Sequence, residues 1–267
     1  MKYFNSKESD FYKKLGIFLD KRSYNNNDEV EKYVKGIIKK VKLKGDKYLF
    51  EMSKKFDGID LNKSNIKVSS KTINKYKNEI NSNYLNSFKI AIKNITNFHK
   101  KQIPTNYEIK KNSKKIGMIW KPIKSVGLYV PGGNAFYPSS LIMNVIPAQV
   151  AGVKRIVLAT PSKNGLFNPY ILALIDLLKI KEVYQIGGAQ AIAALAYGTD
   201  SIDPVNKIFG PGNAFVTNAK KLVFGKVGID LIAGPSEIVV VTDESNKPAW
   251  VAADLIAQAE HDEKAQS

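Results

Sequence analysis

Apolar residues in the first hundred positions recur with the spacing of α-helices. In the first predicted helix they share one face: Val30, Val34, Ile37, Ile38 and Val41. Asn or Asp near residues 26–28 can cap this helix, and Gly45 with Asp46 would end it and start another. A further helix is predicted from about residue 83 to 101, with an apolar stripe of Leu85, Phe88, Ile92, Ile95 and Phe98. The sequence therefore predicts a helical amino-terminal region.

The pattern changes to alternation between residues 107 and 123, where Asn112 and Ser113 join two short runs, as is typical of a β-hairpin. From residue 126 onward, short apolar runs alternate with helical stretches. The predicted strands are VGLYV, RIVLAT, VYQIG, KIFG and IDLIA, and the helices between them cover about 143–151, 169–178, 189–197 and 213–224. This alternation indicates a parallel sheet covered by helices. A further strand, EIVVVTD, precedes a helix predicted at about 247–264.

Three glycine-rich turns each lie between a predicted strand and the next helix: YVPGGNAFYPSS, QIGGAQAIAAL and FGPGNAFVTNAK. Glycine lets a ligand approach the backbone, and the free N–H groups that open a helix favour anionic groups such as pyrophosphate. In open α/β sheets such turns lie at the carboxyl ends of strands, where ligands bind. None of the turns has the G-x-G-x-x-G or Walker pattern. They suggest a nucleotide site, and tight chain reversal alone is the alternative.

The composition limits the chemistry. The chain has no cysteine, which excludes disulfides, thiolate metal sites and cysteine nucleophiles. Its formal net charge is +17, and the whole positive excess lies before residue 131. A basic half can bind nucleic acid through phosphates, but here no arginine-rich stripe or aromatic stacking platform accompanies the lysines. We therefore expect solvated lysine-rich faces and no nucleic-acid partner.

Length and hydropathy place the chain among globular proteins. With 267 residues and 44% hydrophobic content it can bury one large core or two smaller ones. Its opening, MKYFNSKESD, lacks the apolar stretch of a secretory signal, and no apolar run reaches the length of a membrane span. We expect a cytoplasmic protein with no membrane partner.

The last predicted helix carries two residues that can bind a metal. Gln258 and His261 are three positions apart and therefore share a helix face. Zinc usually takes four ligands, so two of them make a weak and unspecific site, and a lone histidine on a polar helix is more often solvated. The residues alone leave both roles open.

Together these segments resemble the histidinol dehydrogenase family. The resemblance rests on VGLYVPGGNAFYPSSLIMNVIPAQVAGV, QIGGAQAIAALAYGT, IFGPGNAFVTNAKKLV, IDLIAGPSEIVVVTD and DLIAQAEHDEKAQS, which have the family's order and spacing. It extends more weakly through GDKYLFEMSKKFDG. It implies an NAD-dependent, zinc-containing enzyme that oxidises L-histidinol to L-histidine through L-histidinal in histidine biosynthesis, a four-electron oxidation.

The resemblance also implies which residues contact the cofactor. Tyr129, Gln190 and Asn213 match the family's NAD-contacting positions. Each of them lies in or beside one of the three glycine turns. The resemblance and the pattern of turns therefore predict the same part of the sheet as the dinucleotide site.

Substrate and metal roles follow from the same resemblance. Ser236 matches a substrate-binding residue, and Gln258 with His261 matches the first two protein ligands of a zinc ion that also positions the substrate. In the family, proton transfer belongs to an adjacent glutamate–histidine pair beyond the AEHD segment. We therefore expect no catalytic residue before Ser267, and Glu260 with His261 is not that pair.

The fold implied by the resemblance is α/β, with two incomplete Rossmann-like units that have parallel-sheet cores. Residues 1–125 would form the amino-terminal helical part of the first unit. Residues 126–236 would form an inserted Rossmann-like domain with the NAD-contacting turns, and residues 237–267 would return to the first unit. The family's enzyme is a homodimer with shared zinc sites, and we expect this chain to be the amino-terminal part of such an enzyme.

Two alternative functions make different predictions. A non-catalytic dinucleotide-binding protein would bind NAD without forming NADH when histidinol is added. A basic nucleic-acid binder would show salt-sensitive binding that is lost when the lysines before residue 130 are neutralised. The family resemblance favours the dehydrogenase over both.

Overall fold

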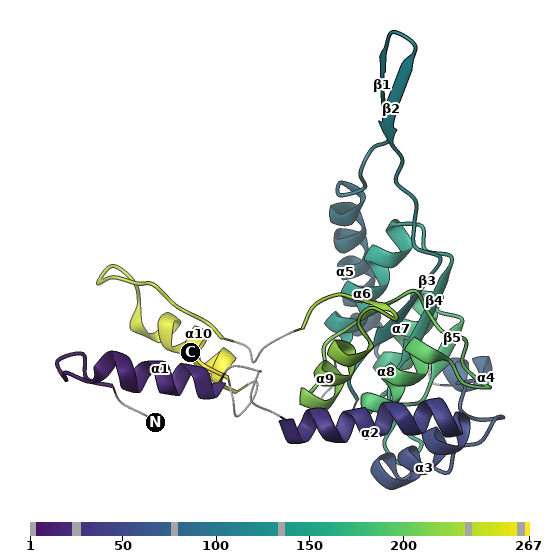
Figure 1. The fold of residues 1–267 in the computed structure, drawn as a ribbon, viewed down its shortest axis with the longest axis horizontal. Coiled ribbons are helices and arrows are strands. Elements are labelled where there is room, and N and C mark those ends of the chain that lie inside the picture. Colours follow the sequence, from purple (N-terminus) through teal and green to yellow (C-terminus); the bar gives the residue numbers. More distant parts are fainter. Residues whose placement is uncertain (1–3, 23–27, 76–79, 133–136, 233–236, 261–264) are drawn as a thin grey trace. The chain divides into compact units, whose positions relative to one another are not determined.

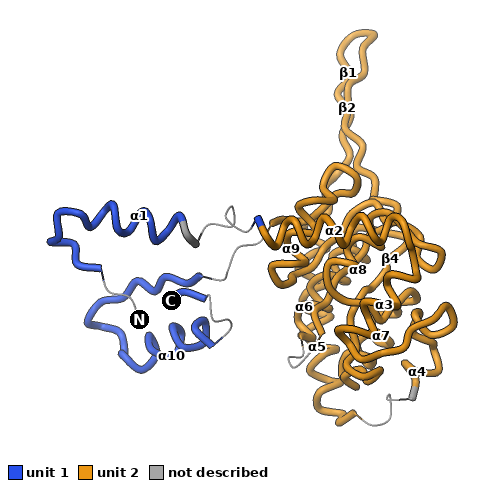
Figure 2. The backbone as a smooth tube through the Cα atoms, turned by 60° about the horizontal axis from the view of Figure 1, so that its bottom comes forward, with its two compact units in different colours: residues 1–28, 233–267 blue, residues 29–232 orange. Residues whose placement is uncertain are grey.

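The computed structural model describes residues 4–22, 28–75, 80–132, 137–232, 237–260 and 265–267. The chain forms two compact units, one of residues 29–232 and one of residues 1–28 with 233–267 (Figure 2). The predicted domain boundaries near residues 125 and 236 concern the whole enzyme and stay a prediction.

A five-stranded parallel sheet forms the centre of the larger unit (Figure 1). Its strands are β3 (Ser125–Tyr129), β4 (Arg155–Ala159), β5 (Glu182–Tyr184), β6 (Lys207–Phe209) and β7 (Gly228–Ile229). They follow the order β5-β4-β3-β6-β7, and all neighbours are parallel. The predicted α/β fold with a parallel sheet is therefore confirmed for this unit.

Helices cover both faces of the sheet. Their bounds are α2 (Asp28–Lys44), α3 (Asp46–Asp57), α4 (Ser70–Lys75), α5 (Ser82–Lys100), α6 (Pro138–Val150), α7 (Pro169–Leu177), α8 (Gly188–Tyr197) and α9 (Ala214–Val223). In the central strand β3, Val126 and Leu128 belong to one buried cluster, with residues of α5, α6 and α7. Tyr129 belongs to the other cluster, with residues of α2, α3, α8 and α9. Because successive strand residues point to opposite faces, these two clusters are the two sides of the sheet.

The helix predictions hold in most places. The break between the first two predicted helices lies at Gly45, where φ is 52°. One boundary was wrong, since α6 begins at Pro138 and not near Met143. Proline is favoured in the first turn of a helix because its missing N–H has no helical partner there.

The predicted hairpin is present and projects from the larger unit (Figure 1). Strand β1 (Tyr107–Lys111) pairs antiparallel with β2 (Lys114–Met118), and Asn112 in the turn has a φ of 55°. All residues of both strands are exposed. The two pairs Tyr107 with Met118 and Ile109 with Ile116 put apolar side chains on one face.

The smaller unit contains two helices among its described residues, α1 (Phe11–Arg22) and α10 (Pro248–Ala259). The predicted strand EIVVVTD is wrong for the described residues, where only an isolated bridge joins Glu237 to Gln266. Val239 and Val241 are 86% and 93% exposed, and a lone strand is not stable without a partner. A second Rossmann-like unit stays a prediction. None of the helices in the described ranges is long and apolar enough to cross a membrane.

Candidate functional site

The strand order places a topological switch point between the carboxyl ends of β3 and β6, the expected position of a ligand-binding crevice. The chain proceeds from β3 to β4 and β5 on one side, and it then returns to place β6 on the other side of β3. The helix that follows β3 packs on one face of the sheet, while α9, which follows β6, packs on the other. In doubly wound folds the carboxyl ends of two such strands form the ligand-binding crevice.

The turn after β6 lies against the end of β3. Gly210 has a φ of 122°, and a Cβ atom at this position would overlap the carbonyl oxygen of Tyr129. Only glycine therefore allows the two backbones to approach this closely. The turn leads to Asn213, whose side-chain oxygen accepts hydrogen bonds from the N–H groups of Phe215 and Val216, both at 3.1 Å. Asn213 is exposed and caps the start of α9.

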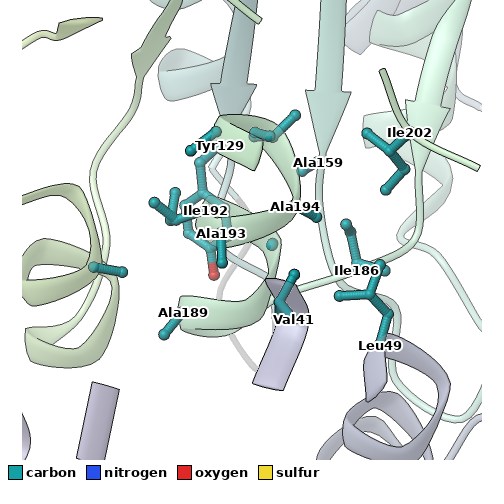
Figure 3. Close-up of a cluster of buried hydrophobic side chains, with 14 of the residues drawn as sticks. Val41, Leu49, Tyr129, Ala159, Ile186, Ala189, Ile192, Ala193, Ala194 and Ile202 are labelled. Atoms are coloured by element: carbon teal, nitrogen blue, oxygen red, sulfur yellow. The ribbon is translucent and has the colours of Figure 1, made fainter. Parts of the chain in front are cut away.

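Tyr129 connects the end of β3 to the turn after β5. Its ring lies beside Ile192 and Ala193 of α8, with the hydroxyl toward the start of that helix near Ala189 (Figure 3). The hydroxyl oxygen accepts a hydrogen bond of 3.1 Å from the N–H of Gly188. Burial raises the pKa of this hydroxyl above its ordinary value. The group therefore stays protonated, and its own hydrogen can be donated.

Gln190 lies over the same glycine turn. A Cβ at Gly188 would be 2.8 Å from the Oε1 of Gln190, so the side chain folds back across the turn. Gln190 is only 4% exposed, and it has no hydrogen-bond partner among the described residues. Its place over the glycine turn makes Gln190 a candidate for ligand contact. The fold thus brings together the turns that carry Tyr129, Gln190 and Asn213.

A buried ion pair at this crevice was missed by the sequence analysis. Lys220 of α9 donates a hydrogen bond of 2.9 Å to the carbonyl of Gly210 and pairs with Asp230. Asp230 in turn accepts a hydrogen bond of 2.8 Å from the N–H of Gly210. One signal could have found it, because Lys220 occupies the same helical stripe as Val216 and Val223.

Asp57, at the end of α3, is a second group that the sequence analysis missed. Its Oδ2 is buried and has no hydrogen-bond partner among the described residues. Burial raises the pKa of this carboxyl from 3.8 to about 6. Its charge also raises the pKa of Tyr129, so the two groups are close enough to interact.

Because the pKa of Asp57 is raised, replacing this carboxyl by a neutral group should stabilise the fold, and the gain should depend on pH. In the unfolded chain the carboxyl ionises near 3.8 and in the folded chain near 6, so the ionised carboxyl destabilises the fold above pH 6. This penalty shrinks as the pH falls from 6 toward 4. We expect Asp57→Asn to raise the midpoint of thermal unfolding by a few degrees at neutral pH and by much less near pH 4. The exposed Asp60, replaced in the same way, is the control and should show no such gain at either pH; an equal gain at both pH values for Asp57→Asn would contradict the explanation.

The predicted substrate and metal residues are less completely described. Gln258 lies in α10 of the smaller unit, and its Nε2 is buried with no hydrogen-bond partner in the described part of the chain. Ser236 and His261 lie outside the described residues. Within the described ranges no group of three or more His, Cys, Asp or Glu side chains could hold a metal. Of the two predicted zinc ligands, Gln258 lies among the described residues and His261 does not.

A hollow of about 770 Å³ lies elsewhere in the larger unit. It is lined by the end of α5, the residues between the hairpin and β3, and α6, and it contains none of the predicted site residues. The β3–β6 crevice is the better candidate, because it combines glycine turns, a helix start and the predicted contacts Tyr129, Gln190 and Asn213.

Comparison with known proteins decides the family. The family model described as histidinol dehydrogenase matches residues 20–267. The chain belongs to the histidinol dehydrogenase family. It is 47% identical over 262 residues to histidinol dehydrogenase of Brucella melitensis biotype 1, covering 97% of this chain and 60% of that protein. It is 51% identical over 242 residues to the enzyme of Listeria innocua serovar 6a, covering 90% and 56%.

A solved structure of the family has the same fold. The crystal structure of histidinol dehydrogenase from Elizabethkingia anophelis matches with a TM-score of 0.84 and 39% identity, covering 89% of this chain and 55% of that one. The chain spans 56% to 60% of the length of the two curated relatives above. The family's enzymes are therefore substantially longer than this chain.

Proposed function

We propose that this chain forms the dinucleotide-binding part of an NAD-dependent, zinc-containing enzyme that oxidises L-histidinol to L-histidine. One observation carries the proposal. The turns after β5 and β6 both meet Tyr129 at the end of β3, through Gly188 and Gly210 respectively, and the predicted cofactor contacts Gln190 and Asn213 follow these two turns. Family membership adds the substrate class, and the proposal includes a cytoplasmic homodimer, as the resemblance implies.

Each of the three residues offers a different polar group to the cofactor. The Oδ1 of Asn213 is used in capping α9, which leaves its amide N–H groups for a ligand at the helix start, where anionic groups are favoured. The Tyr129 hydroxyl accepts from Gly188 and can donate its own hydrogen. The amide of Gln190 lacks a described partner, and polar groups of the cofactor would satisfy it. NAD⁺, when bound, supplies the hydride acceptor.

Zinc and substrate would be held by residues of the smaller unit. The side-chain oxygen of Gln258 would be one ligand, as the resemblance implies, and its buried Nε2, which has no described partner, could donate to another group of the complete site; His261 would be the second ligand. Such an ion would hold and orient the substrate, and Ser236 would contact the substrate. The glutamate–histidine pair that would take the substrate's protons is predicted beyond Ser267. The residues named here would bind and orient the cofactor and the substrate.

Asn213→Asp tests the cofactor site without disturbing the helix. Aspartate keeps the capping oxygen, but it removes the N–H donor and places a negative charge where pyrophosphate would bind. We expect the Kd for NAD⁺, measured by isothermal titration calorimetry, to rise about tenfold.

The matched control is Asn168→Asp. Asn168 caps α7 in the same way, accepting a hydrogen bond from the N–H of Tyr170 at 2.9 Å, and it is not among the predicted cofactor contacts. Its replacement should leave the Kd within about twofold of the wild type. Equal effects of both variants, or no NAD⁺ binding by the wild type, would contradict the proposed site.

The alternative of a non-catalytic dinucleotide-binding protein shares the same crevice. The two functions differ in one readout, because only the dehydrogenase forms NADH when L-histidinol is added to the full-length protein together with NAD⁺ and zinc.

A further inference from the structure

We propose that Lys220 and Asp230 are positioning residues of the dinucleotide site, which hold the Gly210 turn and through it Asn213. The inference rests on the proposed function, because it assigns these residues a role toward the same cofactor. Neither residue was a candidate from the sequence. Neither is proposed to touch the reacting atoms.

The ion pair binds both backbone polar groups of Gly210. Lys220 Nζ donates to the carbonyl oxygen of Gly210 at 2.9 Å, and Asp230 Oδ2 accepts from the N–H of Gly210 at 2.8 Å. The two side chains are joined by their own salt bridge. Asp230 Oδ1 also accepts from the N–H of Leu231 at 2.7 Å. Both polar groups of Gly210 are therefore satisfied from the side of α9 and the end of β7.

Burying this ion pair costs free energy, because both charges lose water. Its presence therefore calls for a geometric reason. The side chain of Lys220 is 5% exposed and that of Asp230 is 20% exposed. Around Lys220 the same stripe of α9 is apolar, with Val216, Ala219 and Val223 fully buried. An apolar side chain at position 220 would pack without desolvating a charge. Such a side chain could not donate a hydrogen bond to the carbonyl of Gly210, as Lys220 does. This hydrogen bond is the advantage of lysine over an apolar residue at position 220.

The Gly210 turn depends on these hydrogen bonds to keep its conformation. Gly210 has a φ of 122° and lies against the carbonyl of Tyr129, and a glycine without its hydrogen bonds can leave this conformation readily. Asn213 follows in the same turn and opens α9. Loss of the ion pair would therefore move the start of α9 and the Asn213 amide. These groups would then no longer be oriented to bind the cofactor together with Tyr129 and Gln190.

The pair acts through position and not through net charge. Lys220 and Asp230 neutralise each other, so they add little field at the crevice for an anionic ligand. A direct attraction between Lys220 and phosphate would make NAD⁺ binding depend on salt through this residue. A positioning role predicts that removal of the pair weakens binding by the same factor at low and at high salt.

The test compares Lys220→Met and Asp230→Asn with Lys221→Met. Lys221 is adjacent on α9, but it is exposed and pairs with Glu31 at 3.1 Å, so it controls for loss of a lysine. We expect the Kd for NAD⁺ to rise about tenfold in the first two variants and to stay within about twofold in the control. The double variant Lys220→Met/Asp230→Asn, which leaves no uncompensated charge, should bind more weakly than the wild type by the same factor at low and at high salt. Wild-type affinity in folded Lys220→Met and Asp230→Asn would overturn the proposal.

A measurement on the unmodified protein keeps the inference testable if a variant fails to fold. The amide proton of Gly210, observed by NMR, should exchange with solvent far more slowly than the amide of Gly225, which lies in an exposed turn. Fast exchange at Gly210 would overturn the positioning role. If exchange is slow but the wild type does not bind NAD⁺, Lys220 and Asp230 do hold the Gly210 turn, but the proposed dinucleotide function is wrong.

Discussion

Replacement of Gly210 by alanine is expected to destabilise the larger unit by on the order of 3–5 kcal/mol and to abolish NAD⁺ binding. The added Cβ would overlap the carbonyl oxygen of Tyr129, and the residue would have to keep a φ of 122° that side chains disfavour. Either β3 and the turn separate or the hydrogen bonds from Lys220 and Asp230 break. Urea unfolding followed by circular dichroism gives the free energy, and calorimetric titration gives the binding.

The variant Gly225→Ala is the control that separates the cost of a positive φ from the cost of steric overlap by the Cβ atom. Gly225 also has a positive φ, of 94°, but nothing lies within 4 Å of its ideal Cβ position. Its replacement should therefore cost only about 1–2 kcal/mol, from backbone strain alone. If the two alanine variants lost equal stability, close packing of the turn against β3 would not be the reason for glycine at position 210.

Leu128→Ala is expected to destabilise the same unit by about 2–5 kcal/mol. Leu128 lies in the central strand, is 0% exposed and belongs to the buried cluster that β3 shares with α5, α6 and α7. Truncation removes buried apolar area and leaves a cavity between a sheet and helices that are held by many other contacts. The free energy of unfolding in urea measures the loss.

Leu43→Ala is the matched control for that substitution. Leu43 is 74% exposed in α2, and alanine is at least as good a helix former as leucine. We expect a change within about 0.5 kcal/mol. A similar loss in both variants would mean that the effect arises from the unfolded chain and not from the core.

The strands and helices of the larger unit could be predicted from the sequence because their signals are local. The face formed by Val34, Ile37 and Val41 is visible from spacing alone, and all three are buried as expected. The segment EIVVVTD has an equally strand-like composition, but pairing depends on a neighbour that no local pattern reveals. That segment accordingly lacks strand pairing beyond a single bridge.

The candidate site required tertiary information in addition. The sequence places Tyr129, Gln190 and Asn213 at turns, but their convergence depends on β6 lying next to β3. Lys220 resembles any helix lysine until Asp230 is known to lie beside it. Asp57 was missed for a similar reason, since its raised pKa comes from burial in the folded chain.

The hairpin of β1 and β2 has a consequence for how this family's chains can vary. Among the described strands, β1 and β2 pair only with each other, all their residues are exposed, and the turn that joins them lies at the far end of the projection (Figure 1). Helix α5, which precedes it, is held by packing on α6 and α7 and not by the hairpin. The turn is thus a point at which residues can be inserted or lost without a change in the register of the sheet.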